Sequence, residues 1–249
     1  LIYQIGTHET RILIDVPDNI YEGASKNGGV KNYIREKVIS TLPDSVQPMV
    51  EVALQEGRLR SMPNSWLPPD LNKTAGIVLL GDAMNMRHPL IGGGMTVGLN
   101  DVALVSELLN PQNMPSLQDS DAVFKQIKTF HSRRKAYSMT LNVLAQALYS
   151  LFVADDPQLR VLQRGFVQYI KRGGACIDEP AGLLGGVINN PWLLFYHFFA
   201  VAVCSLRILV VDRYSTSIWY LPSAIIECVR VFVKACQVIL PFVFLELMA

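Results

Sequence analysis

The sequence is poor in cysteine, and its charges nearly cancel. Four cysteines occur in 249 residues, and no two of them form a CxxC pair. We therefore expect no metal site, and reduced thiols packed as small hydrophobic side chains favour a reducing, cytosol-facing setting. The 22 basic and 21 acidic residues leave a net charge of +1. Because no global field attracts a polyanion, we expect no nucleic-acid partner.

The sequence also lacks the GxGxxG motif, in which glycines and a helix N-terminus hold the pyrophosphate of a dinucleotide. It begins in a strand-like segment without an initiator methionine. We therefore expect the chain to be a fragment of a larger protein, and we expect it to hold a dinucleotide cofactor poorly when alone.

The most informative segment runs from Ile77 to Leu109. Its first four residues, 77–80, are apolar and are followed by Gly81 and Asp82. A short apolar run bounded by glycines is typical of a strand buried in an α/β sheet, and such sheets bind ligands at the carboxyl ends of their strands. The carboxylate of Asp82 could accept hydrogen bonds from ribose hydroxyls there.

A triple glycine, Gly92 to Gly94, precedes apolar residues at helical spacing that end before Pro111. Three missing side chains let a ligand approach the backbone, and the first amides of a helix stabilise an electron-rich group. The pattern predicts a cofactor pocket, although an ordinary connection between a strand and a helix fits these residues as well.

Longer motifs narrow the prediction. They are RSMP at 60–63, LLGDAMNMRHPL at 79–90, GGGMTVGLNDV at 92–102, LLGG at 183–186 and HFFAVAV at 197–203, together with YQIGTHETRILIDVP at 3–17. These motifs resemble those of the squalene monooxygenase (squalene epoxidase) family, in particular its fungal members. The resemblance covers nearly the whole chain in register and implies the carboxyl-terminal portion of such an enzyme.

The resemblance implies FAD-dependent epoxidation of squalene to 2,3-oxidosqualene in sterol biosynthesis. Electrons would come from NADPH through a reductase, with NADPH–cytochrome P450 reductase as the expected partner. The expected setting is the endoplasmic reticulum (microsomal) membrane, facing the cytosol. No catalytic side chain is expected, because the chemistry belongs to the flavin.

The resemblance also implies two sets of residues. The cofactor-binding set is Gly81, Asp82, Gly93, Gly94 and Met95. The substrate-pocket set is Pro89, Leu90 and His197.

The fold class implied is α/β, with this chain as an α+β fragment of it: part of a flavin-monooxygenase fold, with a Rossmann-like FAD-binding domain and substrate-domain strands, followed by a helical membrane-associated end. Residues 1–70 would be the end of the substrate-binding domain, and 71–112 the carboxyl-terminal part of the FAD-binding domain with the Gly-Asp motif. Residues 113–190 would form a helical region lining the pocket, and 191–249 a membrane-associated helical hairpin.

Local patterns predict two strands joined by a turn within 3–16, a short helix at 33–42 and a strand at 50–60. Beyond Pro111 the pattern becomes helical, with helices that start near residue 120 and after Asp155. We interpret the apolar stripe Leu159, Leu162, Phe166 and Ile170 as core, with the lining of a hydrocarbon pocket as the alternative. We interpret the basic cluster His131, Arg133, Arg134 and Lys135 as a solvated helix face, with a membrane-surface or reductase-docking role as the alternative.

Two segments near the C-terminus point to a membrane. Residues 192–211 are almost wholly apolar and would extend about 30 Å as a helix, enough to cross a hydrocarbon core. His197 and Arg207 argue against a simple span. In 222–248 the charges of Glu227, Arg230 and Lys234 lie along one helix face. We expect a hairpin that lies in one leaflet against membrane lipid, with a spanning tail as the alternative.

The sequence departs from the family pattern at two places. Ile91 stands where threonine is usual, and Asp178 and Glu179 stand near a segment that is usually small and neutral. Carboxylates near an apolar cavity are costly unless solvated or paired. Two alternatives therefore stay open: a catalytically impaired or truncated paralogue that acts as a membrane-bound scaffold, and a related flavin hydroxylase with a soluble aromatic substrate.

Overall fold

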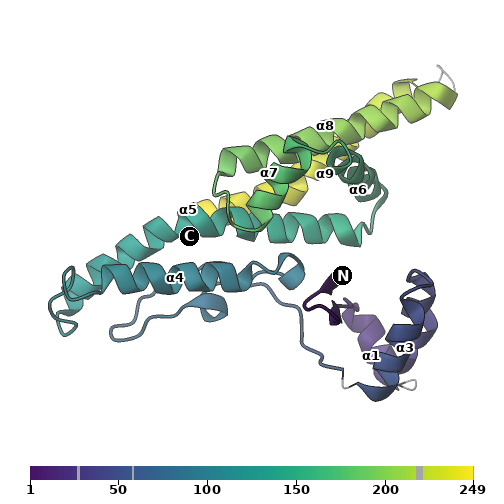
Figure 1. The fold of residues 1–249 in the computed structure, drawn as a ribbon. Coiled ribbons are helices and arrows are strands. Elements are labelled where there is room, and N and C mark those ends of the chain that lie inside the picture. The colour runs from purple at the N-terminus through teal and green to yellow at the C-terminus, as the bar shows by residue number, and fades with distance from the viewer. Residues whose placement is uncertain (27–28, 58, 217–220, 249) are drawn as a thin grey trace. The chain divides into compact units, whose positions relative to one another are not determined.

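The computed structural model describes residues 1–26, 29–57, 59–216 and 221–248. The chain is mostly helical (Figure 1) and divides into two compact units, Leu1–Pro63 and Asn64–Ala249. Each unit has its own buried core.

The first unit begins with a hairpin. Strands β1 (Ile2–Gln4) and β2 (Thr10–Ile12) pair in antiparallel register, with Ile2 opposite Ile12. The two strands predicted within 3–16 are thus confirmed. The helices that follow are α1 (Asp18–Lys26), α2 (Val30–Tyr33), the π-helical turn η1 (Ile34–Val38), the 3-10 turn η2 (Ile39–Thr41) and α3 (Gln47–Glu56). The short helix predicted at 33–42 is therefore present as α2, η1 and η2, which lie end to end.

The strand predicted at 50–60 is wrong, because residues 47–56 form helix α3. Val50 and Leu54, four residues apart, fall on the same helix face and are buried against Ile34. Pro48 lies in the first turn, where its missing N–H costs nothing. Residue 58 lies outside the described residues.

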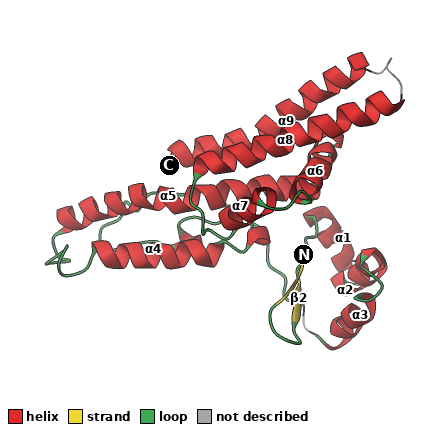
Figure 2. Cartoon of the chain, turned by 45° about the horizontal axis from the view of Figure 1, so that its top comes forward, coloured by secondary structure: helices red, strands yellow, loops and turns green. Residues whose placement is uncertain are grey.

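The second unit is a bundle of helices preceded by a loop-rich segment (Figure 2). Its elements are the 3-10 turns η3 (Gly81–Ala83) and η4 (Pro89–Ile91), followed by α4 (Gly94–Leu108), α5 (Ser120–Val153), α6 (Pro157–Ile170), α7 (Ala175–Leu184), α8 (Pro191–Thr216) and α9 (Leu221–Met248). Helices α8 and α9 lie side by side, and both pack on α6. The main core contains Leu148 and Leu151 of α5, Leu162 of α6 and Val231 and Val238 of α9.

Helix starts in this unit follow the predicted capping logic. Asp119, one residue before the predicted start, caps α5 by accepting a hydrogen bond from the Ala122 amide. Asp156 caps α6 through the Leu159 amide. Leu159 and Leu162 of the predicted stripe are buried in the main core, and Phe166 packs against it. The interpretation of this stripe as core is confirmed for these three residues.

The strand predicted at 77–80 is wrong. The predicted fold class holds only in part: the predicted helical end is present, but the described residues are mostly helical rather than an α/β mixture. The described residues hold two strands, and both belong to the hairpin of the first unit. Residues 77–80 form no ladder, and Ile77 and Leu79 are exposed. An apolar run becomes a buried strand only where neighbouring strands satisfy its backbone on both sides, and the described part of the chain places none there. The predicted boundaries at 70, 112 and 190 stay predictions.

Candidate functional site

Residues 81–95, the glycine segment, form two tight turns that lead into α4. Gly81 (φ 59°) opens η3 and Gly92 (φ 66°) ends η4, so both occupy the left-handed region that favours glycine. Gly93 then caps α4 without any side-chain hydrogen bond to the first amides. The start of α4 therefore offers N–H groups and a partial positive charge that no capping side chain satisfies.

Asp82 lies beside this helix start. A Cβ atom added at Gly94 would lie 3.8 Å from Asp82 Oδ1. The Asp82 side chain is exposed, and among the described residues none donates a hydrogen bond to its carboxylate. Met95, in the first turn of α4, is 76% exposed, and Gly92 has open space around it. The exposed groups of the glycine segment are thus an acceptor at Asp82, an open backbone at Gly92 and an apolar side chain at Met95, and we call these three residues its accessible surface.

A network of buried polar side chains connects the glycine segment to the helical bundle, and Arg87 of the segment is at its centre. Arg87 Nη1 donates to the Gly93 carbonyl oxygen (3.3 Å), and Nε donates to Asn142 Oδ1 of α5 (2.8 Å). Its Nη2 reaches Asn85 Oδ1 (2.8 Å). Burial lowers the pKa of the Arg87 guanidinium, and nearby carboxylates, with Asp82 the strongest, oppose that shift. A buried, charged side chain thus donates a hydrogen bond to the backbone of the triple glycine.

The same network extends to α4, α5 and α9. Asn142 Nδ2 donates to Asn85 Oδ1 (2.8 Å) and to Glu246 Oε1 (2.7 Å). Arg134 Nε pairs with Asp101 Oδ1 (2.8 Å), and its Nη2 also reaches Asn85 Oδ1 (3.2 Å). Two buried guanidiniums are therefore balanced by two buried carboxylates, those of Asp101 and Glu246. The sequence analysis missed this network, because its members are spread from residue 85 to residue 246.

The interpretation of residues 131–135 as a solvated face is wrong for two of them. Arg134 is only 3% exposed because it pairs with Asp101. His131 Nε2 accepts a hydrogen bond from the Asn72 amide (2.9 Å), and burial lowers the pKa of this imidazole. Arg133 does lie on the surface, where it pairs with Glu107. Helix α5 thus turns one face of the cluster toward the glycine segment.

Pro89 and Leu90 lie in η4, directly before the glycines. His88 Nδ1 accepts a hydrogen bond from the Leu90 amide (3.2 Å), and the His88 ring stacks on Tyr149 of α5 with centroids 4.0 Å apart. The side chains of Leu90 and Ile91 pack against the main core, whereas Pro89 is exposed. This segment therefore joins the glycine loop to the interior of the helical bundle.

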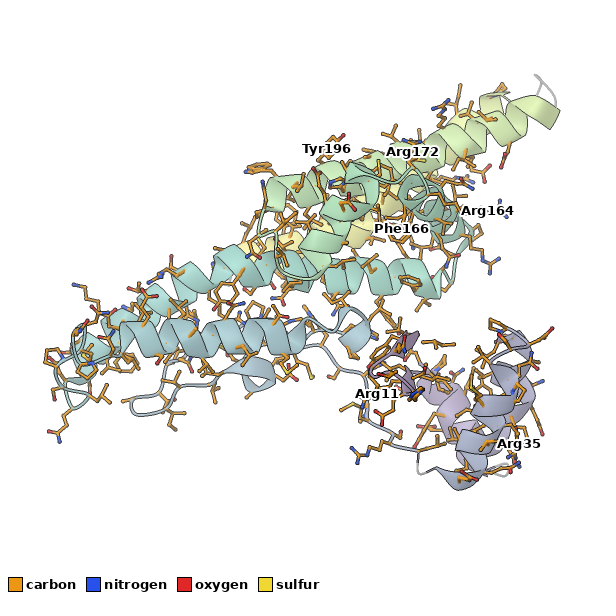
Figure 3. The ribbon with its side chains drawn as sticks, in the orientation of Figure 1. Arg11, Arg35, Arg164, Phe166, Arg172 and Tyr196 are labelled. Carbon is orange, nitrogen blue, oxygen red and sulfur yellow. The ribbon has the colours of Figure 1, made fainter. Side chains whose placement is uncertain are left out.

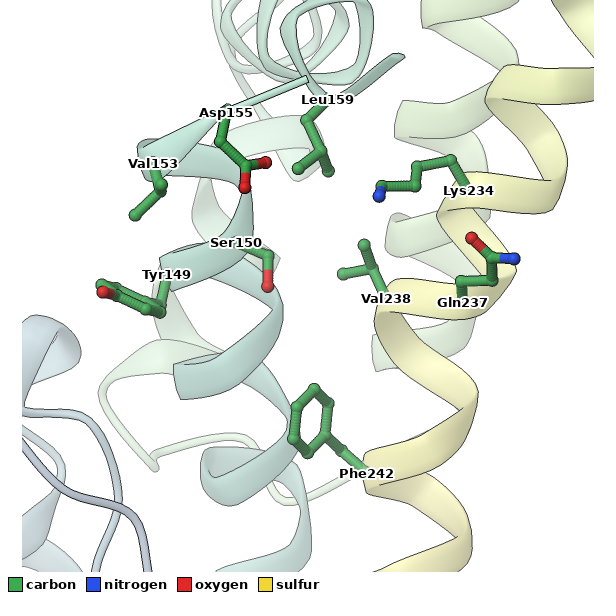
Figure 4. Close-up of a pocket in the computed structure, with 9 residues that line it drawn as sticks. All are labelled: Tyr149, Ser150, Val153, Asp155, Leu159, Lys234, Gln237, Val238 and Phe242. Carbon is green, nitrogen blue, oxygen red and sulfur yellow. The ribbon is translucent and has the colours of Figure 1, made fainter. Parts of the chain in front are cut away.

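A cavity of about 360 Å³ opens beside Tyr149, between the end of α5 and helix α9 (Figure 4). Its lining mixes apolar and polar side chains: Tyr149, Ser150, Val153, Asp155, Leu159, Lys234, Gln237, Val238 and Phe242. Tyr149 also stacks on His88, the residue before Pro89, so one side chain of the cavity lining contacts the glycine segment.

His197 of α8 lies in a separate buried cluster. Its Nδ1 lies 2.7 Å from the Tyr169 hydroxyl, and its Nε2 lies 2.7 Å from Glu179 Oε2. The guanidinium of Arg172 lies over the Tyr169 ring, and the Tyr196 ring meets that of His197 edge to face. Figure 3 labels Arg172 and Tyr196. Among the described residues, His197 does not line the 360 Å³ cavity. Of the three predicted pocket residues, Pro89 and Leu90 are thus neighbours along the chain, whereas His197 lies elsewhere in the bundle.

The pairing of Glu179 answers a question raised by the sequence. Its carboxylate contacts His197 and is 39% exposed, so it is both paired and partly solvated. Asp178 is exposed. The two acidic residues that depart from the family pattern therefore carry no large burial cost.

In the described part of the chain, three helices are long and apolar enough to cross a membrane: Ser120–Val153, Pro191–Asp212 and Pro222–Met248. Helix α5 is largely buried within the bundle, whereas α9 exposes Ile225, Ile226 and Val229. Lys234, one of its three predicted face charges, pairs with Asp156 at the start of α6. Among the described residues no cluster of His, Cys, Asp or Glu could hold a metal ion.

Comparison with known proteins identifies the family. The family model of squalene epoxidase matches residues 1–224. The squalene epoxidase of Aspergillus fumigatus is 52% identical over 246 residues, which are 99% of this chain and 50% of that protein. That of Gibberella zeae is 50% identical over 250 residues, again 99% of this chain and 50% of the relative.

A less similar relative from an animal also matches over nearly the whole chain. The squalene monooxygenase of Rattus norvegicus is 39% identical over 249 residues, 99% of this chain and 41% of that protein. The chain therefore spans about half the length of the curated relatives it matches. At this identity and coverage, the chain belongs to the squalene epoxidase family.

Proposed function

We propose that the chain is the carboxyl-terminal part of an FAD-dependent monooxygenase that converts squalene to 2,3-oxidosqualene in sterol biosynthesis. Relatives named squalene epoxidase and squalene monooxygenase support the substrate and the reaction. The observation that carries the proposal for this chain is the accessible surface of Asp82, Gly92 and Met95 above the buried Arg87.

The residues of this surface fit a flavin nucleotide. Asp82 offers carboxylate oxygens that the described residues leave without a hydrogen-bond donor, which suits ribose hydroxyls. The open start of α4 suits an electron-rich edge of a ring, and Met95 can cover a flat apolar face. Gly81 and Gly93 would shape the loop, while Gly94 and Met95 would lie beside the cofactor.

Bound FAD would supply activation of O₂ and transfer of one oxygen atom to an alkene. The residues of this chain would then position the substrate and exclude water. Squalene has no polar group, so recognition must come from burial of apolar area, about 25 cal/mol for each Å². Pro89 and Leu90, between the glycines and the apolar core, are suited to border both molecules. We assign His197 to a more remote part of the same pocket, on the resemblance alone.

We also propose that α8 and α9 hold the protein on the cytosolic face of the endoplasmic reticulum membrane, where NADPH–cytochrome P450 reductase would supply electrons. The support is the exposed apolar surface of α9, formed by Ile225, Ile226 and Val229. The charge of Arg230, which is exposed beside Val229, favours a helix in the interface over one that crosses hydrocarbon.

Replacing Asp82 by alanine in the full-length protein should weaken FAD binding about ten- to a hundredfold. The loss follows from removing hydrogen bonds to a charged acceptor, which typically contribute roughly 1.5 to 3 kcal/mol. Flavin titration measures the effect. Asp70→Ala is the matched control, because Asp70 is an exposed carboxylate that contacts Lys73 and the amide of Leu71 at the surface. Equal FAD affinity in both variants would remove Asp82 from the cofactor site.

Replacing Ile225 and Val229 by aspartate should release the full-length protein from microsomes. Each of these side chains is more than half exposed, so the bundle should fold without them. Burial of such a side chain contributes about 1.5 to 3 kcal/mol, so the double variant should partition at least roughly a hundredfold less into membrane. Sedimentation after a salt wash measures this.

The control is the double variant Met49→Asp, Val52→Asp, which makes the same change at exposed positions of α3. Unchanged sedimentation of the α9 variant would contradict the assigned membrane face. A glycosylation tag at the C-terminus that becomes modified in the lumen would replace the interfacial hairpin by a spanning tail.

A further inference from the structure

Helix α9 carries a carboxylate in the interior of the second unit. Glu246 is 5% exposed, whereas its neighbour Leu247 is 61% exposed. A buried carboxylate loses its hydration and is retained only where hydrogen bonds or opposite charges compensate. Glu246 lies beyond residues 1–224, the range that the family model matches. Its partners therefore show what the end of α9 contributes to the rest of the bundle.

The partner of Glu246 is Asn142 in the middle of α5. Asn142 Nδ2 donates to Glu246 Oε1 (2.7 Å), and Asn142 Oδ1 accepts from Arg87 Nε (2.8 Å). A carboxylate can only accept and a guanidinium can only donate. Glu246 and Asn85, whose Oδ1 also accepts from Asn142 Nδ2 (2.8 Å), together turn the N–H₂ group of Asn142 away from Arg87. Without Glu246 the amide keeps only one of these two acceptors, which weakens its hold on the orientation that Arg87 requires.

Arg87 passes this constraint to the glycine segment. Its Nη1 donates to the carbonyl oxygen of Gly93, the residue that caps α4. Asp82 lies beside the next residue, Gly94, and Met95 follows in the first turn. A continuous chain of three hydrogen bonds thus connects the end of α9 to the backbone that bears the accessible surface.

We propose that Glu246 is a positioning residue for the glycine segment, acting through Asn142 and Arg87 on the Gly93 carbonyl. The inference rests on the proposed function, since it gives this segment the task of receiving FAD. It makes the geometry of the cofactor surface depend on the last turns of the membrane-associated helix. The contact that matters is the hydrogen bond accepted from Asn142, so a neutral side chain of the same length should replace Glu246.

The test uses three variants of the full-length protein: Glu246→Gln keeps the length and an acceptor, Glu246→Asp keeps the charge but shortens the reach, and Glu246→Ala removes both. The first readout is hydrogen–deuterium exchange of the amides in residues 92–96 without added FAD. The second is the FAD dissociation constant. Leu247→Ala, a truncation at the adjacent exposed position, is the control.

In Glu246→Ala and Glu246→Asp we expect about tenfold faster exchange of the glycine amides and about tenfold weaker FAD binding. Glu246→Gln and Leu247→Ala should stay within threefold of the parent in both readouts. If Glu246→Ala does not fold, the comparison of the glutamine and aspartate variants decides alone.

The proposal is overturned if glutamine is as harmful as alanine, if aspartate is better tolerated than glutamine, or if none of the variants changes the exchange of residues 92–96. Failure of the proposed function gives a different result. In that case the parent itself binds no FAD, while the exchange data still report whether Glu246 holds the glycine segment.

Discussion

Replacing Arg134 by alanine should destabilise the protein by roughly 3 to 5 kcal/mol, because it leaves the buried carboxylate of Asp101 without its ion-pair partner. Asp101 is fully buried, and Arg134 Nε lies 2.8 Å from its Oδ1. The Tyr137 hydroxyl still donates to the same oxygen (2.7 Å), yet one neutral donor does not offset an unpaired charge. Total stabilities of roughly 5 to 15 kcal/mol leave little margin for this loss. Urea unfolding of the full-length protein measures it.

Arg133→Ala is the matched control one residue away. Arg133 forms two hydrogen bonds to Glu107, at 2.7 and 3.1 Å, but both side chains are about half exposed. Such surface pairs contribute about 0 to 1 kcal/mol. A double variant, Arg134→Met with Asp101→Leu, should recover stability relative to Arg134→Ala, since it removes the stranded charge. Equal losses for Arg133→Ala and Arg134→Ala would mean that the buried pair does not stabilise the bundle.

This contrast also shows what the sequence could not predict. Four basic residues between 131 and 135 follow the pattern of a solvated face, and the burial of one of them, Arg134, depends on Asp101, an acidic residue 33 positions away. Helical periodicity reports the neighbours of a residue along its own helix, whereas a long-range ion pair depends on how two helices pack. Glu246 was missed for the same reason, because Asn142 lies 104 residues away.

Helix starts and ends were predictable from sequence where residues next to them in the chain determine them. The start of α4 at Gly94, its end before Pro111 and the cap of α6 at Asp156 follow from glycine, proline and capping side chains. The strand at 77–80 failed because a strand needs partners that the local sequence does not contain. The run at 50–60 failed because short apolar runs suit helices and strands alike, and Pro48 in the first turn was the signal for a helix.

The candidate site was predictable only as a segment. The glycine loop and Asp82 were found from composition and from resemblance to a family, and their role in binding FAD stays a prediction. Arg87 lay inside the quoted motif LLGDAMNMRHPL, yet nothing in its neighbours indicated that it would be buried against the Gly93 carbonyl. The position of a buried cation can be inferred from sequence only when its acceptors are also known.

Replacing Gly93 by valine should abolish FAD binding and squalene turnover, with a loss of roughly a hundredfold or more, which corresponds to about 2.7 kcal/mol. Gly93 is buried at φ −75°, so the backbone conformation suits any residue and space is the limiting factor. A Cβ atom here would lie 3.3 Å from Ile91 Cδ1 and 3.4 Å from Leu141 Cδ2. The two further methyl groups of valine would push the loop off Arg87 and toward the cofactor face. Gly23→Val in α1, where a Cβ atom meets nothing within 4 Å, is the control.

The crowding at Gly93 involves the side chain of Ile91. Ile91 Cδ1 is the nearest atom to the added Cβ, and Ile91→Val removes that atom while leaving the branched Cβ in place. Gly93→Ala alone should weaken FAD binding by a smaller factor than valine, and Ile91→Val should restore much of it in the double variant. Flavin titration of the four proteins completes a double-mutant cycle. Additive effects would show that Ile91 and Gly93 do not compete for the same space, and a fully active Gly93→Val protein would show that this glycine serves only as a loop residue.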